Sequence, residues 1–145
     1  MVAMDESAER ERGRVRITGL KAMELGNSTG QSLVRVETDS GLYGIGEAGV
    51  AGPACRANLQ WLGRVLIGAD PLNRERLWQE GMRLDRYKYL AHGVRGLVDV
   101  ALWDLVGKIT DLPVFRLIGG FRDRIPCYKS GGNLPDVEDF VKDAV

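Results

Sequence analysis

The chain has 145 residues, 44% of them hydrophobic, which is enough to bury a core and typical of a folded protein. Its 20 basic and 20 acidic residues cancel, which removes the electrostatic case for nucleic acid or an anionic membrane as partner. No apolar run approaches the roughly 20 residues of a transmembrane helix, and residues 1–14 lack the apolar core of a signal peptide. We therefore expect a cytoplasmic protein with a flexible leader over residues 1–14.

The first half of the chain contains three strand patterns. Residues 15–25 carry apolar side chains loosely on one face, and residues 32–38 alternate between apolar and charged side chains. The turn residues 39–41 then lead into a third apolar segment over 42–47. Residues 26–30 have the composition of a loop. These segments predict a three-stranded antiparallel meander.

Three helical patterns follow. Pro53 occupies a first-turn position before a helix predicted over 54–66, and Asp70 is an expected N-cap for a second helix over 72–82. The third helix, over 93–110, has apolar residues at every three or four positions. Because Val100 and Trp103 lie off that apolar stripe, we expect this helix to be buried on most sides.

After the third helix, Pro113 and the turn over 117–120 interrupt regular structure. Residues 125–128 are β-like, residues 130–133 form a loop by composition, and residues 135–145 begin another helix. The order is three strands, three helices, one strand and the start of a helix. This order predicts an α+β fold in which a helical bundle follows the meander.

Glycines in the third strand segment match the dinucleotide fingerprint Gly44-x-Gly46-x-x-Gly49, and Asp70 follows at about the expected spacing. The polar segment 37–41 breaks the apolar run that a nucleotide-binding strand requires. Turn geometry at a sheet edge explains the glycines better, and a helix cap explains Asp70. A nucleotide-binding module is therefore the weaker alternative.

The side chains with catalytic or metal-binding potential also have structural explanations. Asp99 and Asp104 lie five residues apart on one helix and cannot clamp one metal ion, so we expect pairing with Arg95 or Lys108. One histidine cannot build a histidine-rich zinc site, and the two distant cysteines favour reduced thiols. Three tryptophans are expected to be core aromatics, namely Trp61, Trp78 and Trp103.

Two further residues keep two interpretations each. Glu47 closes the third strand before a run of small residues, so it either faces a cleft or is a hydrogen-bonded structural carboxylate. Lys129 shares a strand face with Cys127. In a barrel, a lysine at the end of that strand points into the active-site mouth; without a barrel it is a solvated charge.

Several short motifs occur in collinear order from residue 15 onwards: Gly44-Ile45-Gly46-Glu47; Leu66-Ile67-Gly68-Ala69-Asp70-Pro71; Glu75, Leu77, Trp78 and Met82; Asp99 to Lys108; Leu112-Pro113-Val114; Leu117-Ile118-Gly119-Gly120; and Ile125-Pro126-Cys127-Tyr128. The ordered set resembles the capping domain of the enolase superfamily, in the branch of mandelate racemase and the muconate lactonizing enzymes. The resemblance implies a capping domain over residues 15–124. Residues 125–145 would then be the first strand and the start of the first helix of a (β/α)₈ barrel.

Enzymes of this family abstract a proton α to a carboxylate and stabilise the enediolate with Mg²⁺. The resemblance therefore implies a small carboxylate substrate such as an acid sugar, and a homo-oligomer by analogy with relatives. Two loops of the cap select the substrate, and by position they correspond to residues 26–30 and 48–53. The implied specificity residues are Asn27, Ser28, Thr29, Ala48, Gly49 and Val50, with Lys129 and Ser130 at the end of the barrel strand.

The resemblance also implies what this sequence does not contain. The family's acid/base residues and metal-binding carboxylates lie on later strands of a barrel that needs about 250 residues. No residue here receives a catalytic or metal-binding role. We therefore expect the lid portion of a sugar-acid dehydratase or racemase, which alone binds no Mg²⁺ tightly and turns over no substrate. The alternative is a cap that docks with a barrel from another polypeptide.

Overall fold

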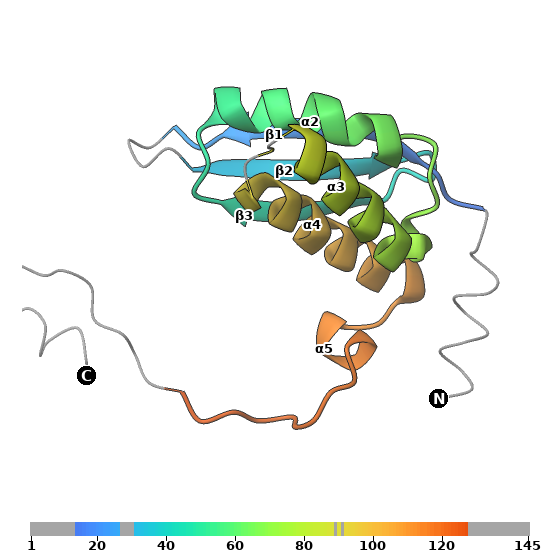
Figure 1. Ribbon diagram of the computed structural model, residues 1–145. Helices are drawn as coiled ribbons and strands as arrows, with labels where there is room; N and C mark the ends of the chain where they lie inside the picture. Colours follow the sequence, from blue (N-terminus) through green and yellow to red (C-terminus); the bar gives the residue numbers. More distant parts are fainter. Residues whose placement is uncertain (1–13, 27–30, 89, 91, 128–145) are drawn as a thin grey trace, which may run out of the picture.

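The computed structural model describes residues 14–26, 31–88, 90 and 92–127, and gives only the backbone of Ala48 and His92. Three strands form one layer, and the three long helices cover one face of it (Figure 1). The elements are β1 (Ile17–Glu24), β2 (Ser32–Thr38), β3 (Tyr43–Ala48), α2 (Gly52–Leu66), the 3₁₀ helix η1 (Pro71–Asn73), α3 (Arg74–Lys88), α4 (His92–Thr110) and α5 (Val114–Leu117). This two-layer α+β arrangement confirms the expected fold class.

The sheet is the predicted antiparallel meander, in the order β1-β2-β3. Alternate residues of the central strand β2 are buried, because its inward side chains meet the helices and its outward side chains face solvent. Val34 and Val36 are fully buried at the centre of this inward face. The register of β1 shifts between Ile17 and Gly19, where one extra residue forms a bulge.

Helix α4 lies close against β3 because two glycines leave room for its backbone. A Cβ atom on Gly44 would collide with the carbonyl group of Ala101, and one on Gly46 would collide with that of Leu97. Neither glycine has a positive φ angle. The expectation that these glycines provide turn geometry is therefore wrong; they permit a close approach between helix and strand.

The core joins the inward face of the sheet to one broad face of α4 and to the inner faces of α2 and α3. Helix α4 supplies the largest share of the buried apolar side chains, as its periodicity predicts. Val100 is exposed, however, and Trp103 is only half-buried. The expected burial of α4 on most sides is therefore wrong at these positions, because the sheet, α2 and α3 leave one side of the helix open.

The helix boundaries differ from the prediction at two places. Asp70 does cap its helix, since its Oδ1 accepts a hydrogen bond from the backbone N–H of Leu72 at 2.9 Å. The cap begins η1, and α3 starts only at Arg74 and continues beyond Met82 to Lys88. The short helix α5, which follows Pro113, was not predicted from the sequence.

Residues 125–127 belong to no strand in the described part of the chain, although residues 125–128 have a β-like pattern. Ile125 is 73% exposed there. A strand requires a hydrogen-bonded neighbour, and Pro126 has no N–H to donate. Tyr128 lies outside the described residues, as do residues 1–13 of the predicted leader. The division into cap and barrel at residue 125 remains a prediction.

Helix α3 is attached to α4 by an arginine, an aspartate and a tryptophan. Arg74 of α3 donates from Nη1 to Oδ1 of Asp99 at 2.6 Å, and its guanidinium carbon lies 4.1 Å from the centre of the Trp103 ring. The predicted pairing of Asp99 with Arg95 is therefore wrong. Arg74 takes that place because α3 packs against the side of α4 that carries Asp99.

The same combination occurs in the opposite direction between the two helices. Arg95 of α4 donates from Nη1 to Oδ2 of Asp85 at 2.7 Å, and its guanidinium carbon lies 4.5 Å from the centre of the Trp78 ring. Each helix thus contributes one arginine, which contacts an aspartate and a tryptophan of the other helix. All three tryptophans are half-buried, and Trp61, which also lies close to the cations of Arg64 and Lys88, packs against the core as predicted. Trp78 and Trp103 lie beside the core, each in contact with an arginine.

Candidate functional site

The bases of the two expected specificity loops are joined by a buried hydrogen bond. Ser32, the first residue of β2, is 0% exposed, and its Oγ donates to the backbone carbonyl of Val50 at 2.7 Å. The first loop is closed by a bond from the N–H of Leu25 to the carbonyl of Gln31 at 3.1 Å. A hydroxyl group removed from water requires such a partner. Ser32 therefore fixes where the second loop leaves the sheet.

The start of α4 contacts the same place. Val50 is half-buried against the core, and a Cβ atom on Gly93 would lie 2.9 Å from its Cγ2. The connection from β3 to α2 and the start of α4 lie at the same end of the domain (Figure 1). Three segments that are distant in sequence therefore meet around Val50, and its position depends on all three.

The structure brings some of the predicted site residues to this end and leaves others undescribed. Gly49 is exposed, Val50 is half-buried, and Ala48 is the last residue of β3. The remaining predicted site residues lie outside the described part of the chain: Asn27, Ser28, Thr29, Lys129 and Ser130. Sequence reasoning missed Ser32, although a serine at an inward position of an alternating strand was a usable signal.

Glu47 is not the hydrogen-bonded structural carboxylate of its two interpretations within the described residues, and its place in a cleft stays a prediction. Its side chain lies on the exposed face of β3, and it makes no hydrogen bond or ion pair with the described residues. Strand alternation explains this position, because Gly44 and Gly46 occupy the face that meets α4. Glu47 is therefore a solvent-facing charge on the open side of the sheet.

The described residues offer no site for Mg²⁺. None of them form a group of three or more histidine, cysteine, aspartate or glutamate side chains that could hold a metal ion. The best-placed carboxylates, Asp85, Asp99 and Asp104, each pair with an arginine or lysine. Because Mg²⁺ prefers several free oxygen ligands in an octahedral arrangement, these residues do not fit the ion.

Among the described residues, two titratable groups have shifted pKa values, for reasons unrelated to catalysis. The hydrogen bond from Lys21 lowers the pKa of Glu37, against a smaller opposing effect of desolvation, on the open face of the sheet. Burial raises the pKa of the Cys55 thiol. Cys127 is a free and exposed cysteine.

The outer edge of β3 is covered by two side chains of α4. Oδ2 of Asp104 accepts from the N–H of Ile45 at 2.9 Å, and Nζ of Lys108 donates to the carbonyl of Tyr43 at 2.8 Å. The two side chains also pair with each other at 2.7 Å, which confirms the predicted pairing of Asp104 with Lys108. The strand edge contact was not predicted, because nothing local in the sequence relates α4 to β3.

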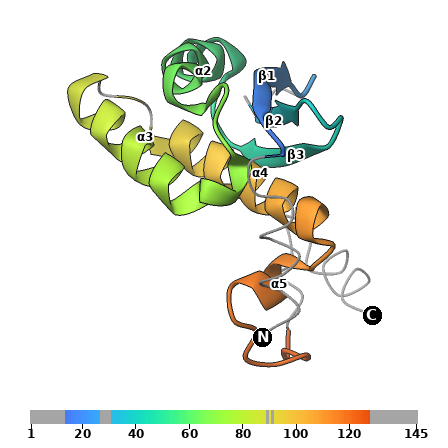
Figure 2. The same ribbon diagram turned by 90° about the vertical axis from the view of Figure 1, so that its right-hand side faces the viewer.

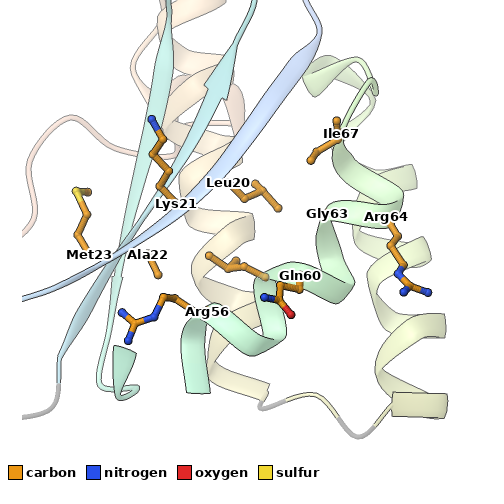
Figure 3. Close-up of a pocket in the computed structure, with 10 residues that line it drawn as sticks. Leu20, Lys21, Ala22, Met23, Arg56, Gln60, Gly63, Arg64 and Ile67 are labelled. Atoms are coloured by element: carbon orange, nitrogen blue, oxygen red, sulfur yellow. The ribbon is translucent and has the colours of Figure 1, made fainter. Parts of the chain in front are cut away.

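A groove of about 900 Å³ lies between β1 and α2 (Figure 3). Its apolar residues include Leu20 and Leu59, and its three charged residues are all cations, Lys21, Arg56 and Arg64. Sequence reasoning missed this groove. The signal was the spacing of Arg56, Gln60 and Arg64, which places three polar side chains on one face of α2.

The nucleotide-binding alternative loses its physical basis. Gly44 and Gly46 are inside β3, where the backbone of α4 occupies the space beside them. A dinucleotide fingerprint requires its glycines in the turn between a strand and a helix, so that pyrophosphate can approach. Asp70 is engaged as the cap of η1. Within the described residues, these positions therefore serve the fold.

The comparisons with known proteins agree with this architecture. A family model for the mandelate racemase / muconate lactonizing enzyme N-terminal domain matches residues 20–119. This match covers more than half of the chain, which therefore belongs to that family of the enolase superfamily. The part matched begins in β1 and ends after α5. It contains the sheet, the helices and the segment around Val50.

Among the curated relatives, a D-galactonate dehydratase family member of Paenibacillus sp. (strain JDR-2) is 38% identical over 136 residues, which are 88% of this chain and 33% of the relative. A mandelate racemase/muconate lactonizing protein from Paracoccus denitrificans Pd1222 has a TM-score of 0.71 and 30% identity over 88% of this chain and 37% of that protein.

A further structure of that description from the same organism, complexed with magnesium, has a TM-score of 0.66 and 27% identity. It matches 79% of this chain and 33% of its own. The chain thus spans about a third of the length of the relatives that it matches. No helix among the described residues is long and apolar enough to cross a membrane.

Proposed function

We propose that this chain is the substrate-selecting lid of a Mg²⁺-dependent enzyme that removes a proton α to a carboxylate, namely a sugar-acid dehydratase or a racemase. The observation that carries the proposal is the meeting of the two loop bases at one end of a cap-type fold, through Ser32 and Val50. A lid must hold its loops in a fixed position over the substrate, since orientation contributes much of catalytic power.

In this proposal the loops bind and orient the substrate and exclude water. Asn27, Ser28 and Thr29 would offer hydroxyl and amide groups to a polyol acid, and residues 48–50 would shape the apolar side of the site. The dehydratase among the relatives supports an acid-sugar substrate. The solved relative complexed with magnesium supports Mg²⁺ in the intact enzyme, where the ion stabilises the charge of the enediolate.

The proposal assigns no proton transfer to the described residues of this chain. It therefore predicts that the purified 145-residue chain neither turns over acid sugars nor binds Mg²⁺ tightly. The test is an assay with a panel of sugar acids and Mg²⁺, with and without EDTA, together with calorimetric titration of Mg²⁺. Turnover that depends on Mg²⁺ and is lost with EDTA would contradict the proposal.

An apolar surface at the end of the described chain favours a second candidate function, in which the cap docks with a barrel supplied by another polypeptide. Phe121 is 88% exposed, and Ile118 and Ile125 are 65% and 73% exposed. Such side chains gathered within a short segment are typical of an interface. Size-exclusion chromatography with the barrel portion of the Paenibacillus relative tests this; independent elution of the two proteins contradicts it.

Oligomerisation of the chain itself is part of the same proposal, by analogy with the family. Multi-angle light scattering of the purified chain over a range of concentrations measures its mass. A mass above that of one 16.0 kDa chain supports a homo-oligomer, and a constant monomer mass contradicts it.

A further inference from the structure

The last paired residues of the sheet lie where both loops begin or end. Glu24 pairs with Ser32, and Ser32 pairs with Ala48. Glu24 ends β1 before the first loop, and Ala48 ends β3 before the second. Directly paired residues of an antiparallel sheet point to the same face, which for the buried Ser32 is the face that meets the helices. Glu24 is therefore directed toward the helices as well.

The end of β1 departs from the apolar pattern of its inward face. The two inward positions before Glu24 are Leu20 and Ala22, and both pack against the core. The next inward position carries a carboxylate in place of an apolar side chain. The helix that faces this side of β1 is α2, which lies beside β1 in the end view of Figure 2. The reason for a carboxylate at this position is therefore found at the start of α2.

The start of α2 has no acidic group of its own. Its N-cap residue Ala51 makes no side-chain hydrogen bond, and its first turn contains no acidic residue. A helix start carries unpaired N–H groups and a partial positive charge. The side chain of Glu24 lies against this start, because a Cβ atom on Gly52 would collide with its Oε1 and Cγ atoms. Glu24 thus supplies from β1 the negative charge that α2 lacks.

The ion pair of Glu24 is the weaker of its two contacts. Nη2 of Arg56 lies 3.7 Å from Oε1 of Glu24, and about half of each side chain is exposed. An exposed pair of this kind contributes little to stability. Gly52, in contrast, is buried, and the contact with Glu24 requires that it has no side chain. The contact with the helix start therefore defines the place of Glu24.

Two contacts therefore connect the flanks of the first loop to the second. Ser32, which follows the first loop, donates a hydrogen bond to the carbonyl of Val50 in the second. Glu24, which precedes the first loop, lies against Gly52, which follows the second. Each flank of one connection is thus in contact with the other connection. Neither base can move without a change at the other.

We propose that Glu24 and Ser32 are positioning residues that couple the bases of the two substrate-selecting loops, an inference that rests on the proposed lid function. Glu24 acts through the start of α2, and Ser32 acts through the carbonyl of Val50. Substrate selection is then a joint property of the two loops. A substitution that displaces the base of one loop also changes the orientation in which the other meets the substrate.

The test is NMR spectroscopy of the full chain, with each signal read at a residue that is not adjacent to the substitution. Ser32→Ala should shift the carbonyl carbon of Val50 upfield, because a hydrogen bond withdraws electron density from that atom. Gly52→Ala displaces Glu24 and should shift the amide of Leu25, which closes the first loop. That amide should also exchange with solvent about tenfold faster.

A matched control is available at the opposite end of β2. Thr38 is also buried there, and its Oγ1 donates to the carbonyl of Leu42 at 2.6 Å. Thr38→Val removes this hydroxyl group and should lower the stability in urea by an amount similar to Ser32→Ala. It should leave the Val50 carbonyl and the Leu25 amide unchanged. A merely structural role of Ser32 would make the two variants indistinguishable at these signals.

Glu24→Ala tests the second contact directly and should shift the amide of Gly52. If Ser32→Ala fails to fold, Gly52→Ala and Glu24→Ala decide. An unchanged Leu25 amide in Gly52→Ala, an unchanged Gly52 amide in Glu24→Ala, or equal shifts in Thr38→Val overturns the coupling. Because these signals involve no substrate, such a result leaves the lid function standing. Mg²⁺-dependent turnover by the chain would instead contradict the lid function alone.

Discussion

The carboxylate of Asp104 accepts a hydrogen bond from the backbone N–H of Ile45, which lies 59 residues earlier in the chain, at 2.9 Å. This contact places a helix side chain where a neighbouring strand would otherwise donate or accept. Lys108, one turn later, donates a hydrogen bond to the carbonyl of Tyr43 and also pairs with Asp104. Two side chains one turn apart on α4 therefore make the hydrogen bonds that a neighbouring strand would make to these two backbone groups of β3.

Replacement of Asp104 by alanine removes both the acceptor for Ile45 and the partner of Lys108. We expect Asp104→Ala to lower the free energy of unfolding by about 1–2 kcal/mol, since hydrogen bonds to charged groups are worth more than neutral ones. Urea denaturation measures the change. The control is Asp123→Ala, which removes an exposed carboxylate and should alter stability by less than about 0.5 kcal/mol. Equal effects would contradict the edge role of Asp104.

Replacement of Gly44 by alanine tests the close approach between β3 and α4. The added Cβ would meet the backbone of Ala101, which cannot rotate away, so we expect a loss of about 3 kcal/mol or failure to fold. Gly49→Ala is the matched control, because nothing lies within 4 Å of its added Cβ. That variant should remain within about 0.5 kcal/mol of the parent in urea denaturation. Similar stability of the two variants would refute the contact.

Replacement of Asp85 by alanine leaves Arg95 largely buried without its carboxylate. We expect Asp85→Ala to cost about 3 kcal/mol, because desolvation of the guanidinium is no longer offset. The double variant Asp85→Ala with Arg95→Met should recover part of this loss. Glu80→Ala, which breaks the exposed pair with Arg83, should cost under about 0.5 kcal/mol in the same thermal unfolding series. A similar cost for both single variants would count against the buried pair.

The pKa of Glu37 can be measured to test how its neighbour Lys21 stabilises the carboxylate. Its pKa is lowered from the ordinary value of a glutamate, mainly because Lys21 donates a hydrogen bond to the carboxylate. A lowered pKa in the folded state adds stability above the ordinary pKa, and this stability is lost as the pH falls through the folded value. We expect Lys21→Met to raise the pKa of Glu37 in an NMR titration, and Lys88→Met to leave it unchanged. No rise in Lys21→Met would contradict this assignment.

The spacing of apolar residues in the sequence was sufficient to predict most strands and helices of the fold. The apolar spacing of α4 and the alternation of β2 reflect burial of one face, which a sequence records directly. The extension of α3 beyond Met82 was not visible because the buried residue of that part, Asp85, is a carboxylate paired with Arg95 and not an apolar side chain. Polar residues that pair across helices look like solvent-facing residues in a sequence.

The site could be predicted only in part, for a similar reason. The resemblance located the second loop, but the role of Ser32 depends on a partner that lies at Val50 in another connection. The glycines of β3 were assigned to turns because their spacing says nothing about the helix that approaches them from α4. Contacts between distant segments thus account for the errors at Ser32 and at the glycines of β3.

The reciprocal contacts of α3 and α4 constrain how this sequence can change over time. Because Arg95 depends on Asp85 and Arg74 on Asp99, a neutral substitution on one helix becomes harmful unless the other helix changes with it. The two pairs share no residue, yet both connect α3 to α4, with the arginine on α3 in one pair and on α4 in the other. Exchange of α3 for a helix without Arg74 and Asp85 would therefore leave Asp99 and Arg95 of α4 without these partners at the same time.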